Sequence, residues 1–132
     1  MLPKKIIAID DDPICILITK KLLEKSGLIG EGVSFKSFNS PREGLTHLIN
    51  ELSFSNGEVI LILDINMPEL SGFDILNEIK SEFTDNLHVF MLTSSISMAH
   101  REMANEYKLI KGYFNKPLNK ESIEILKTYL SK

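Results

Sequence analysis

The stretch Val59-Ile60-Leu61-Ile62-Leu63-Asp64 decides the fold of this chain. Five consecutive apolar residues are typical of a central parallel strand that is covered by helices on both faces. The run ends abruptly in a carboxylate. A charge at the end of a buried strand needs a partner, so Asp64 is the first candidate for chemistry.

On both sides of this run, short apolar stretches alternate with longer amphipathic ones. The predicted strands are Ile6–Ile9, Val33–Phe38, Val59–Leu63, Val89–Leu92 and Gly112–Asn115. The predicted helices start at Pro13, at Ser40-Pro41 with Ser40 as N-cap, at Phe73 (to Phe83), at Met98 (to Tyr107) and after an Asn119 cap. Five repeats of strand and helix predict an α/β fold, a parallel sheet with helices on both faces.

Composition excludes several classes of protein. The 132 residues fit one domain, and the formal net charge of −3 provides no overall basic field for nucleic acid or an anionic membrane. A single cysteine, Cys15, excludes an internal disulfide. The apolar runs are too short to span a bilayer, and Met1 to Lys5 contain no signal-peptide core, so we predict a cytoplasmic protein.

Polar and charged residues follow the predicted strands. Asp10-Asp11-Asp12 follow the first strand, Asp64 the third, Thr93-Ser94-Ser95 the fourth and Lys116-Pro117 the fifth, whereas the second offers only Asn39 and Ser40. In a parallel sheet of this kind, ligands bind beyond the carboxyl ends of the strands. These residues are therefore expected to share one edge of the sheet.

Their charges predict a magnesium-dependent phosphoryl site. Asp10, Asp11 and Asp64 carry −3, and Mg²⁺ with Lys116 would bring the sum to zero. A neutral site can receive a phosphoryl group, with Asp64 as the nucleophile that forms an acyl phosphate. Mg²⁺ and Lys116 would stabilise the oxygens in the transition state, and Thr93 could donate a hydrogen bond to them.

Each motif alone also has an ordinary explanation. A run of three Asp residues after a strand is often a solvated turn, and we expect Asp12 to be a helix N-cap. A lone Thr-Ser-Ser is usually a loop, and a lone Lys-Pro is usually surface. Only their joint position at one edge of the sheet favours a site.

The residues Asp64 to Gly72, Asp-Ile-Asn-Met-Pro-Glu-Leu-Ser-Gly, resemble the phosphoacceptor stretch of response-regulator receiver domains. Asp10-Asp11, Thr93-Ser94 and Lys116-Pro117 resemble the other marks of this family, in the same order. The resemblance covers essentially the whole chain and is closest to stand-alone chemotaxis-type regulators. It implies a flavodoxin-like, doubly wound sheet in the order 2-1-3-4-5, and a single receiver domain over residues 1–132 without an output domain.

The resemblance also implies roles for the metal site. Asp64 would accept the phosphoryl group from a sensor histidine kinase or a histidine phosphotransfer protein. Asp11 would bind Mg²⁺ directly, Asp10 mostly through water, and the backbone carbonyl of Asn66 would complete the protein ligands. The chain would then signal to an output protein, whose identity the sequence does not give, and would not be a turnover enzyme.

Further roles follow from the same resemblance. Thr93 and Lys116 would contact the phosphoryl group. Tyr113 matches an aromatic residue that turns inward when Thr93 moves, and Asn66 and Ser95 match two positions that tune the lifetime of the acyl phosphate. The segment Tyr107–Gly112 departs from the family because it lacks the usual Ala/Gly-rich turn.

The first helix carries more apolar residues than one face can bury. With Cys15, Ile18 and Leu22 expected on the buried face, Ile14 and Leu17 project away from it. In the family this helix docks on the phosphodonor, so both residues are candidate contacts; burial under neighbouring loops is an equal alternative.

Four other functions remain to be weighed. A phosphoryl sink or relay would use the same site without a dedicated output partner. A degenerate receiver acting as a constitutive binding module conflicts with the complete set of acidic residues and lysine. A dehalogenase-type phosphatase would use Asp10 and Asp12, but Pro13 and Ile14 do not fit its motif. A flavodoxin-like cofactor binder would need a Gly/Ser/Thr-rich loop after the first strand.

Overall fold

The computed structural model describes residues 4–30, 32–54, 57–79, 85–94, 102 and 106–130. Its strands are β1 (Lys4–Ile9), β2 (Val33–Phe38), β3 (Glu58–Asp64), β4 (Leu87–Thr93) and β5 (Ile110–Asn115). They form one parallel sheet in the order β2-β1-β3-β4-β5, which confirms the fold implied by the resemblance.

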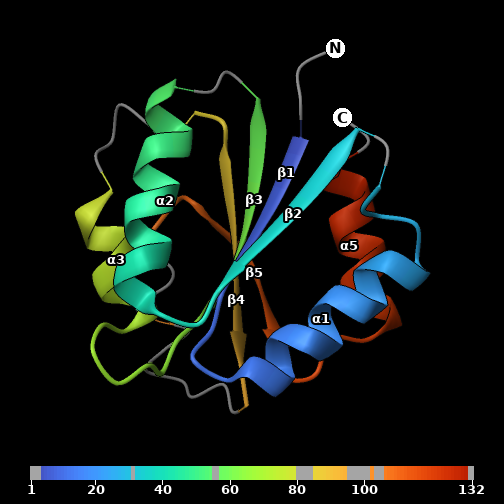
Figure 1. Ribbon diagram of the computed structural model, residues 1–132, viewed down its shortest axis with the longest axis horizontal. Coiled ribbons are helices and arrows are strands. Elements are labelled where there is room, and N and C mark those ends of the chain that lie inside the picture. The colour runs from blue at the N-terminus through green and yellow to red at the C-terminus, as the bar shows by residue number, and fades with distance from the viewer. Residues whose placement is uncertain are drawn as a thin grey trace.

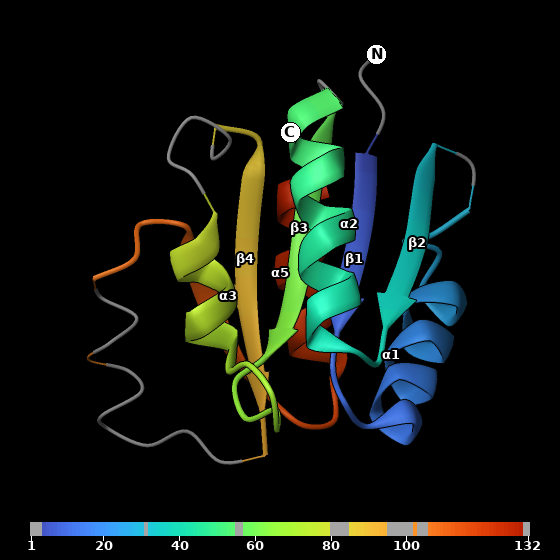
Figure 2. The ribbon, with the colours of Figure 1, turned by 60° about the vertical axis from the view of Figure 1, so that its left-hand side comes forward.

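Helices cover both faces of this sheet. They are α1 (Pro13–Lys25), α2 (Pro41–Phe54), α3 (Gly72–Glu78) and α5 (Lys120–Leu130). Figures 1 and 2 show α2 and α3 on one face and α1 and α5 on the other. No helix within the described ranges is long and apolar enough to cross a membrane. Most of the predicted helix Met98–Tyr107 lies outside the described residues.

Alternation along the strands divides the core into two layers. In β3, Val59, Leu61 and Leu63 face α2 and α3, whereas Ile60 and Ile62 face α1 and α5. All five side chains are at most 2% exposed. The uninterrupted apolar run therefore marks a central strand, as the sequence predicted.

Side-chain hydrogen bonds cap the N-termini of three helices at the residues predicted from the sequence. The Asp12 carboxylate accepts from Ile14 N at 2.9 Å, and the Ser40 hydroxyl accepts from Glu43 N at 3.3 Å. Asn119 Oδ1 accepts from Ser122 N at 2.9 Å. The predicted caps of α1, α2 and α5 are confirmed, and each satisfies a backbone donor that the first helical turn leaves free.

Two details of the sequence prediction are wrong. α3 ends at Glu78, because Ile79 has an extended backbone that interrupts the predicted helix; residues 80–83 of that prediction lie outside the described residues. The buried residues of α1 are Cys15, Ile16, Thr19 and Leu23, whereas Ile18 is 39% exposed. The helix is therefore rotated relative to the predicted face, and a threonine takes a place that the apolar pattern gave to isoleucine.

Gly72, the first residue of α3, packs very closely against the end of β3. Its N–H donates to Ile65 O at 2.9 Å, and a Cβ at this position would lie only 2.6 Å from Asp64 O and 2.8 Å from Met91 Cε. The backbone oxygen cannot move away without disturbing the end of β3. Only glycine therefore fits at the first residue of α3.

We predict that Gly72→Ala lowers the free energy of unfolding by about 2–3 kcal/mol, because the new methyl group overlaps a backbone oxygen. Urea denaturation followed by circular dichroism measures this change. The matched control is Gly112→Ala, where the new Cβ would lie 3.4 Å from a ring carbon of Phe90. Equal losses in the two variants would contradict the steric argument.

Candidate functional site

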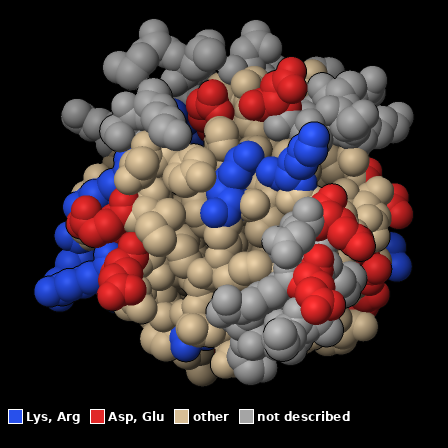
Figure 3. All heavy atoms as spheres, turned by 180° about the vertical axis from the view of Figure 1, so that it is seen from behind, with Lys and Arg blue, Asp and Glu red and all other residues tan. Residues whose placement is uncertain are grey.

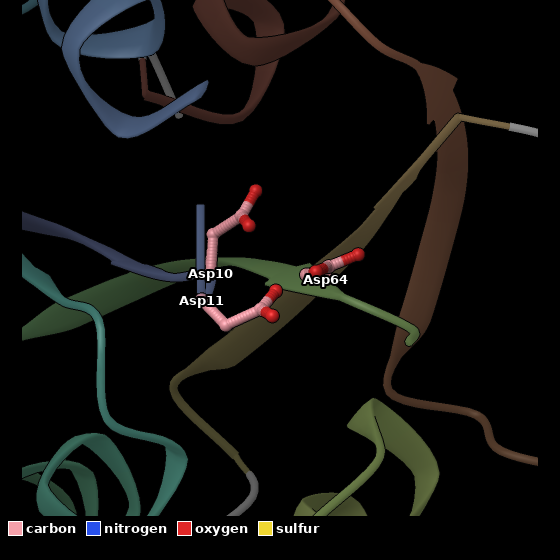
Figure 4. Close-up of side chains that lie close together, drawn as sticks. All are labelled: Asp10, Asp11 and Asp64. Carbon is pink, nitrogen blue, oxygen red and sulfur yellow. The ribbon is translucent and has the colours of Figure 1, made fainter. Parts of the chain in front are cut away.

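Three carboxylates meet at the carboxyl end of the sheet. Asp10 and Asp11 follow β1, Asp64 ends β3, and these two strands are neighbours. One carboxylate oxygen from each lies within 4.8 Å of the others (Figure 4). Asp10 and Asp64 are only 3% and 4% exposed, whereas Asp11 is exposed to solvent. The sequence therefore predicted this cluster correctly.

Backbone contacts fix the position of Asp10. Its N–H donates to Phe38 O at 3.1 Å, and its Oδ1 accepts from Asp12 N at 2.9 Å. The side-chain amide of Asn39 donates to the backbone oxygen of Asp10 at 3.4 Å. The carboxylate is thus held by its own turn and by the end of the neighbouring strand β2.

Lys116 brings the positive charge. Its Nζ lies 3.0 Å from Asp10 Oδ2, 3.3 Å from Asp10 Oδ1 and 3.5 Å from Asp64 Oδ1. Its backbone N–H donates to Thr93 O at 2.8 Å, which fixes the end of β5 beside the end of β4. One ammonium group thereby contacts two buried carboxylates that come from two other strands.

Burial and charge shift the titration of these groups. Burial first, and then the charge of Asp10, raise the pKa of Asp64 to about 7, although Lys116 opposes the change. Burial alone would lower the pKa of Lys116, but its hydrogen bond to Asp10 and the charges of Asp10 and Asp64 raise it above its ordinary value. Lys116 therefore remains a cation, while Asp64 binds a proton near neutral pH unless more positive charge arrives.

The raised pKa of Asp64 predicts how the free energy of unfolding depends on pH when no metal ion is bound. Unfolded Asp64 loses its proton near its ordinary pKa of 3.8, whereas the folded protein holds the proton until about pH 7. The unfolded state therefore binds fewer protons across this window, and Asp64 costs stability as the pH rises through it. We expect Asp64→Asn to raise the free energy of unfolding by about 1–3 kcal/mol at pH 8, and by less at pH 5.

Urea denaturation in a chelating buffer at both pH values measures the effect. The control is Asp85→Asn, the same chemical change at an exposed turn position, which should have little effect at either pH. If Asp64→Asn raised the free energy of unfolding equally at pH 5 and pH 8, a raised pKa of Asp64 would be excluded as the cause.

The residues present suit a divalent cation. Oδ2 of Asp10 is buried and accepts no hydrogen bond from the described residues, although the Lys116 ammonium lies nearby. A buried carboxylate oxygen with a free lone pair, beside two further carboxylates, is a suitable donor for a hard cation. The all-oxygen donor set and the solvent-exposed Asp11 fit Mg²⁺, which usually retains several waters.

Other predicted residues lie around this cluster. Thr93 is fully buried at the end of β4, and Asn66 is exposed in the loop after β3. Tyr113 on β5 is partly buried against the core layer that faces α2 and α3. Ser95 lies outside the described residues. The structure thus brings the strand-end residues together, and the roles of Asn66, Thr93 and Tyr113 remain predictions.

The sequence missed one neighbour of the site. Cys15 was interpreted as a core residue of α1, and it is 7% exposed. Burial first, and then a hydrogen bond to Asp10, raise the pKa of its thiol to about 12, so the thiol stays protonated. Cys15 lies three residues after the helix cap Asp12, on the first turn of α1. This spacing is the feature of the sequence that could have placed Cys15 near Asp10.

Comparison with known proteins identifies the family. A family model described as "Response regulator receiver domain" matches residues 6–126. The chain therefore belongs to the response regulator receiver domain family, which serves two-component and chemotaxis systems and generally signals instead of acting as a turnover enzyme.

Individual relatives agree with this result. The chain is 32% identical over 129 residues to "Chemotaxis protein CheV2" of Helicobacter pylori, covering 97% of this chain and 39% of that protein. It is 25% identical over 122 residues to "Chemotaxis protein CheV1" of the same species, covering 92% and 36%. This chain thus spans less than two fifths of the length of these curated relatives.

A solved structure shares the whole fold. The crystal structure of a two-component response regulator from Cytophaga hutchinsonii matches with a TM-score of 0.83 and 22% identity, covering 100% of both chains. At this identity the match supports the arrangement of strands and helices.

Proposed function

We propose that this receiver accepts a phosphoryl group on Asp64 from a phosphohistidine donor, with Mg²⁺ bound by the acidic cluster, and that it signals through the resulting change of conformation. The observation that carries the proposal is the buried Asp64 carboxylate, 3.5 Å from Lys116 Nζ and clustered with Asp10 and Asp11. A sensor histidine kinase or a histidine phosphotransfer protein would be the donor.

The chemistry follows from the positions of the chain's own groups. An oxygen of Asp64 attacks the phosphorus, the P–N bond of the donor breaks, and the imidazole nitrogen keeps the electron pair. Asp64 must be ionised for this step, so a proton held in the metal-free site has to leave first. Lys116 contacts the transferred oxygens, and the buried Thr93 hydroxyl donates to one of them.

Mg²⁺ would be held by Asp10, Asp11, Asp64 and the backbone carbonyl of Asn66, and would supply positive charge that offsets the carboxylates and the transferred oxygens. Hydrolysis later breaks the bond between phosphorus and the Asp64 oxygen when water attacks the phosphorus. Asn66 and Ser95 would tune the rate of this step.

We expect Mg²⁺-dependent phosphorylation by acetyl phosphate, because the site carries its own nucleophile and charges. Mass spectrometry of the intact protein should show one phosphoryl adduct, which is absent in Asp64→Asn. Lys116→Ala and Asp11→Ala should unfold cooperatively but label slowly, since they remove site charge without removing core volume.

Lys120→Ala is the matched control for Lys116→Ala, because Lys120 is exposed at the start of α5. If Asp64→Asn were still phosphorylated, the assignment of Asp64 as the phosphoryl acceptor would be wrong. Labelling of Lys116→Ala at the parental rate would show that the charge balance is not needed.

We also propose that Thr93 and Tyr113 form the switch. A phosphoryl group adds up to roughly two negative charges and strong acceptor oxygens, which draw Thr93 toward Asp64. Tyr113 would then turn into the space beside β4. Figure 3, the view from behind, shows an area without Lys, Arg, Asp or Glu at the middle of that side of the molecule.

Fluorine NMR on fluorotyrosine-labelled protein tests this switch. The chain has three tyrosines, so each resonance can be assigned by mutation. We expect the Tyr113 resonance to shift when Mg²⁺ and beryllofluoride, a phosphoryl mimic, saturate the site. An unchanged Tyr113 resonance at saturation would mean that the receiver signals by another route.

Exposed apolar residues on α1 support a donor-docking surface. Ile14 is 67% exposed and Leu17 is 52% exposed, so burial under neighbouring loops is excluded. Both lie on the helix that begins beside Asp10 and Asp11. A donor that packs on these side chains would thus reach the same end of the sheet as Asp64.

We expect Leu17→Asp to slow transfer from the cognate phosphohistidine donor by roughly tenfold or more, because it places a charge in an apolar contact. Labelling by acetyl phosphate should be unchanged, since that donor needs no docking surface. Ile125→Asp, at a 44% exposed isoleucine of α5, is the control and should leave both rates unchanged. Equal slowing with both donors in Leu17→Asp would exclude docking as the cause.

A further inference from the structure

Tyr107 contacts α3 at two points. Its ring centroid lies 5.7 Å from that of Phe73 with an interplanar angle of 37°, and its hydroxyl donates to Asn77 Oδ1 at 2.7 Å. Phe73 and Asn77 are four residues apart on a helix, so they lie on the same face, one turn apart. We call this pair of contacts the Tyr107 bridge.

One end of the Tyr107 bridge leads directly to the phosphoacceptor. Phe73 is 5% exposed and follows Gly72, which donates to Ile65 O at 2.9 Å. At Gly72 even a methyl group would come within 2.6 Å of Asp64 O. The first turn of α3 and the end of β3 are therefore packed without free space, and α3 cannot shift without moving the backbone at Asp64.

The other end is fixed near the beginnings of β4, which ends in Thr93, and of β5, which Lys116 follows. Ile110 N donates to Tyr107 O at 3.1 Å, and Val89 N donates to Leu109 O at 3.0 Å. Tyr107 is thus bonded to the first residue of β5, and Leu109, two residues after it, is bonded to β4 near its beginning. It lies in the segment that departs from the family by its bulk, and the bridge gives that bulk a structural role.

We propose that Tyr107 is a positioning residue that holds the segment from Asp64 to Gly72 in its unphosphorylated arrangement, by fixing α3 to the β4–β5 edge through Phe73 and Asn77. This inference rests on the proposed phosphorylation of Asp64. It adds a contact on α3, which is distinct from the proposed Thr93 and Tyr113 switch.

The position of the Tyr107 bridge determines whether its removal favours or disfavours binding of a phosphoryl mimic. A phosphoryl group on Asp64 attracts Thr93, which ends β4, and Lys116, which follows β5. This attraction changes the spacing between those strands and the α3 side of the site. The Tyr107 bridge is made at the spacing of the unphosphorylated protein and stabilises that spacing. Removing it shifts the population toward the phosphorylated arrangement, which a phosphoryl mimic then binds more tightly.

Titration with beryllofluoride in the presence of Mg²⁺ tests this proposal, with binding followed by NMR. Tyr107→Phe keeps the ring and removes the hydrogen bond, and Asn77→Ala removes the same bond from the other side. Each should bind the mimic roughly three- to tenfold more tightly than the parent, which is the range expected for one hydrogen bond. The double variant should gain no more than either single variant.

Tyr129→Phe is the matched control, because Tyr129 packs against His88 and Phe90 on the opposite face of the sheet. A merely structural loss would lower stability without tightening binding. Unchanged or weaker binding in Tyr107→Phe, with tight binding in the parent, would overturn the positioning role alone. Failure of the parent to bind the mimic would instead overturn the proposed function on which that role rests.

Discussion

The structure depends on one electrostatic constraint, which is that two buried carboxylates share one ammonium group. Asp10 and Asp64 end neighbouring central strands and are almost completely buried. Lys116 reaches both of them from β5. Burial, and then the imbalance of two negative charges against one positive charge, raise the pKa of Asp64 to about 7; under the proposed function, Mg²⁺ would remove this imbalance. The burial that makes β3 a central strand thus also raises the pKa of its last residue, Asp64.

Close packing around the strand ends turns this constraint into a rigid site. A Cβ at Gly44 of α2 would lie 2.8 Å from the Ile9 side chain, and one at Gly72 would lie 2.6 Å from Asp64 O. Helices on this face therefore approach β1 and β3 more closely than any larger residue would permit. Under the proposed function, a change of charge on Asp64 would therefore act on residues at the ends of β4 and β5, because the helices packed on β1 and β3 have no room to shift.

Most of the fold could be predicted from the sequence because its signals are local. The apolar run of β3 and the caps at Asp12, Ser40 and Asn119 depend on neighbours within a few residues. Strand order and the acidic cluster then followed from the resemblance and from the geometry of parallel sheets. The end of α3 and the rotation of α1 could not be predicted, because packing against other elements decides them. The contact of Tyr107 with Asn77 joins residues 30 apart, and no local pattern marks it.

The arrangement also separates chemistry from recognition. Under the proposed function, the groups that would transfer the phosphoryl group lie at strand ends and are fixed by the core, so they would act on small phosphoryl donors without a docking surface. Ile14 and Leu17 lie outside that core, and their exposed apolar surface is unfavourable in the free protein. Covering this surface stabilises a complex without altering the charge balance at Asp64. Under the proposed function, substitutions on α1 can therefore change the choice of donor while the reaction at Asp64 stays the same.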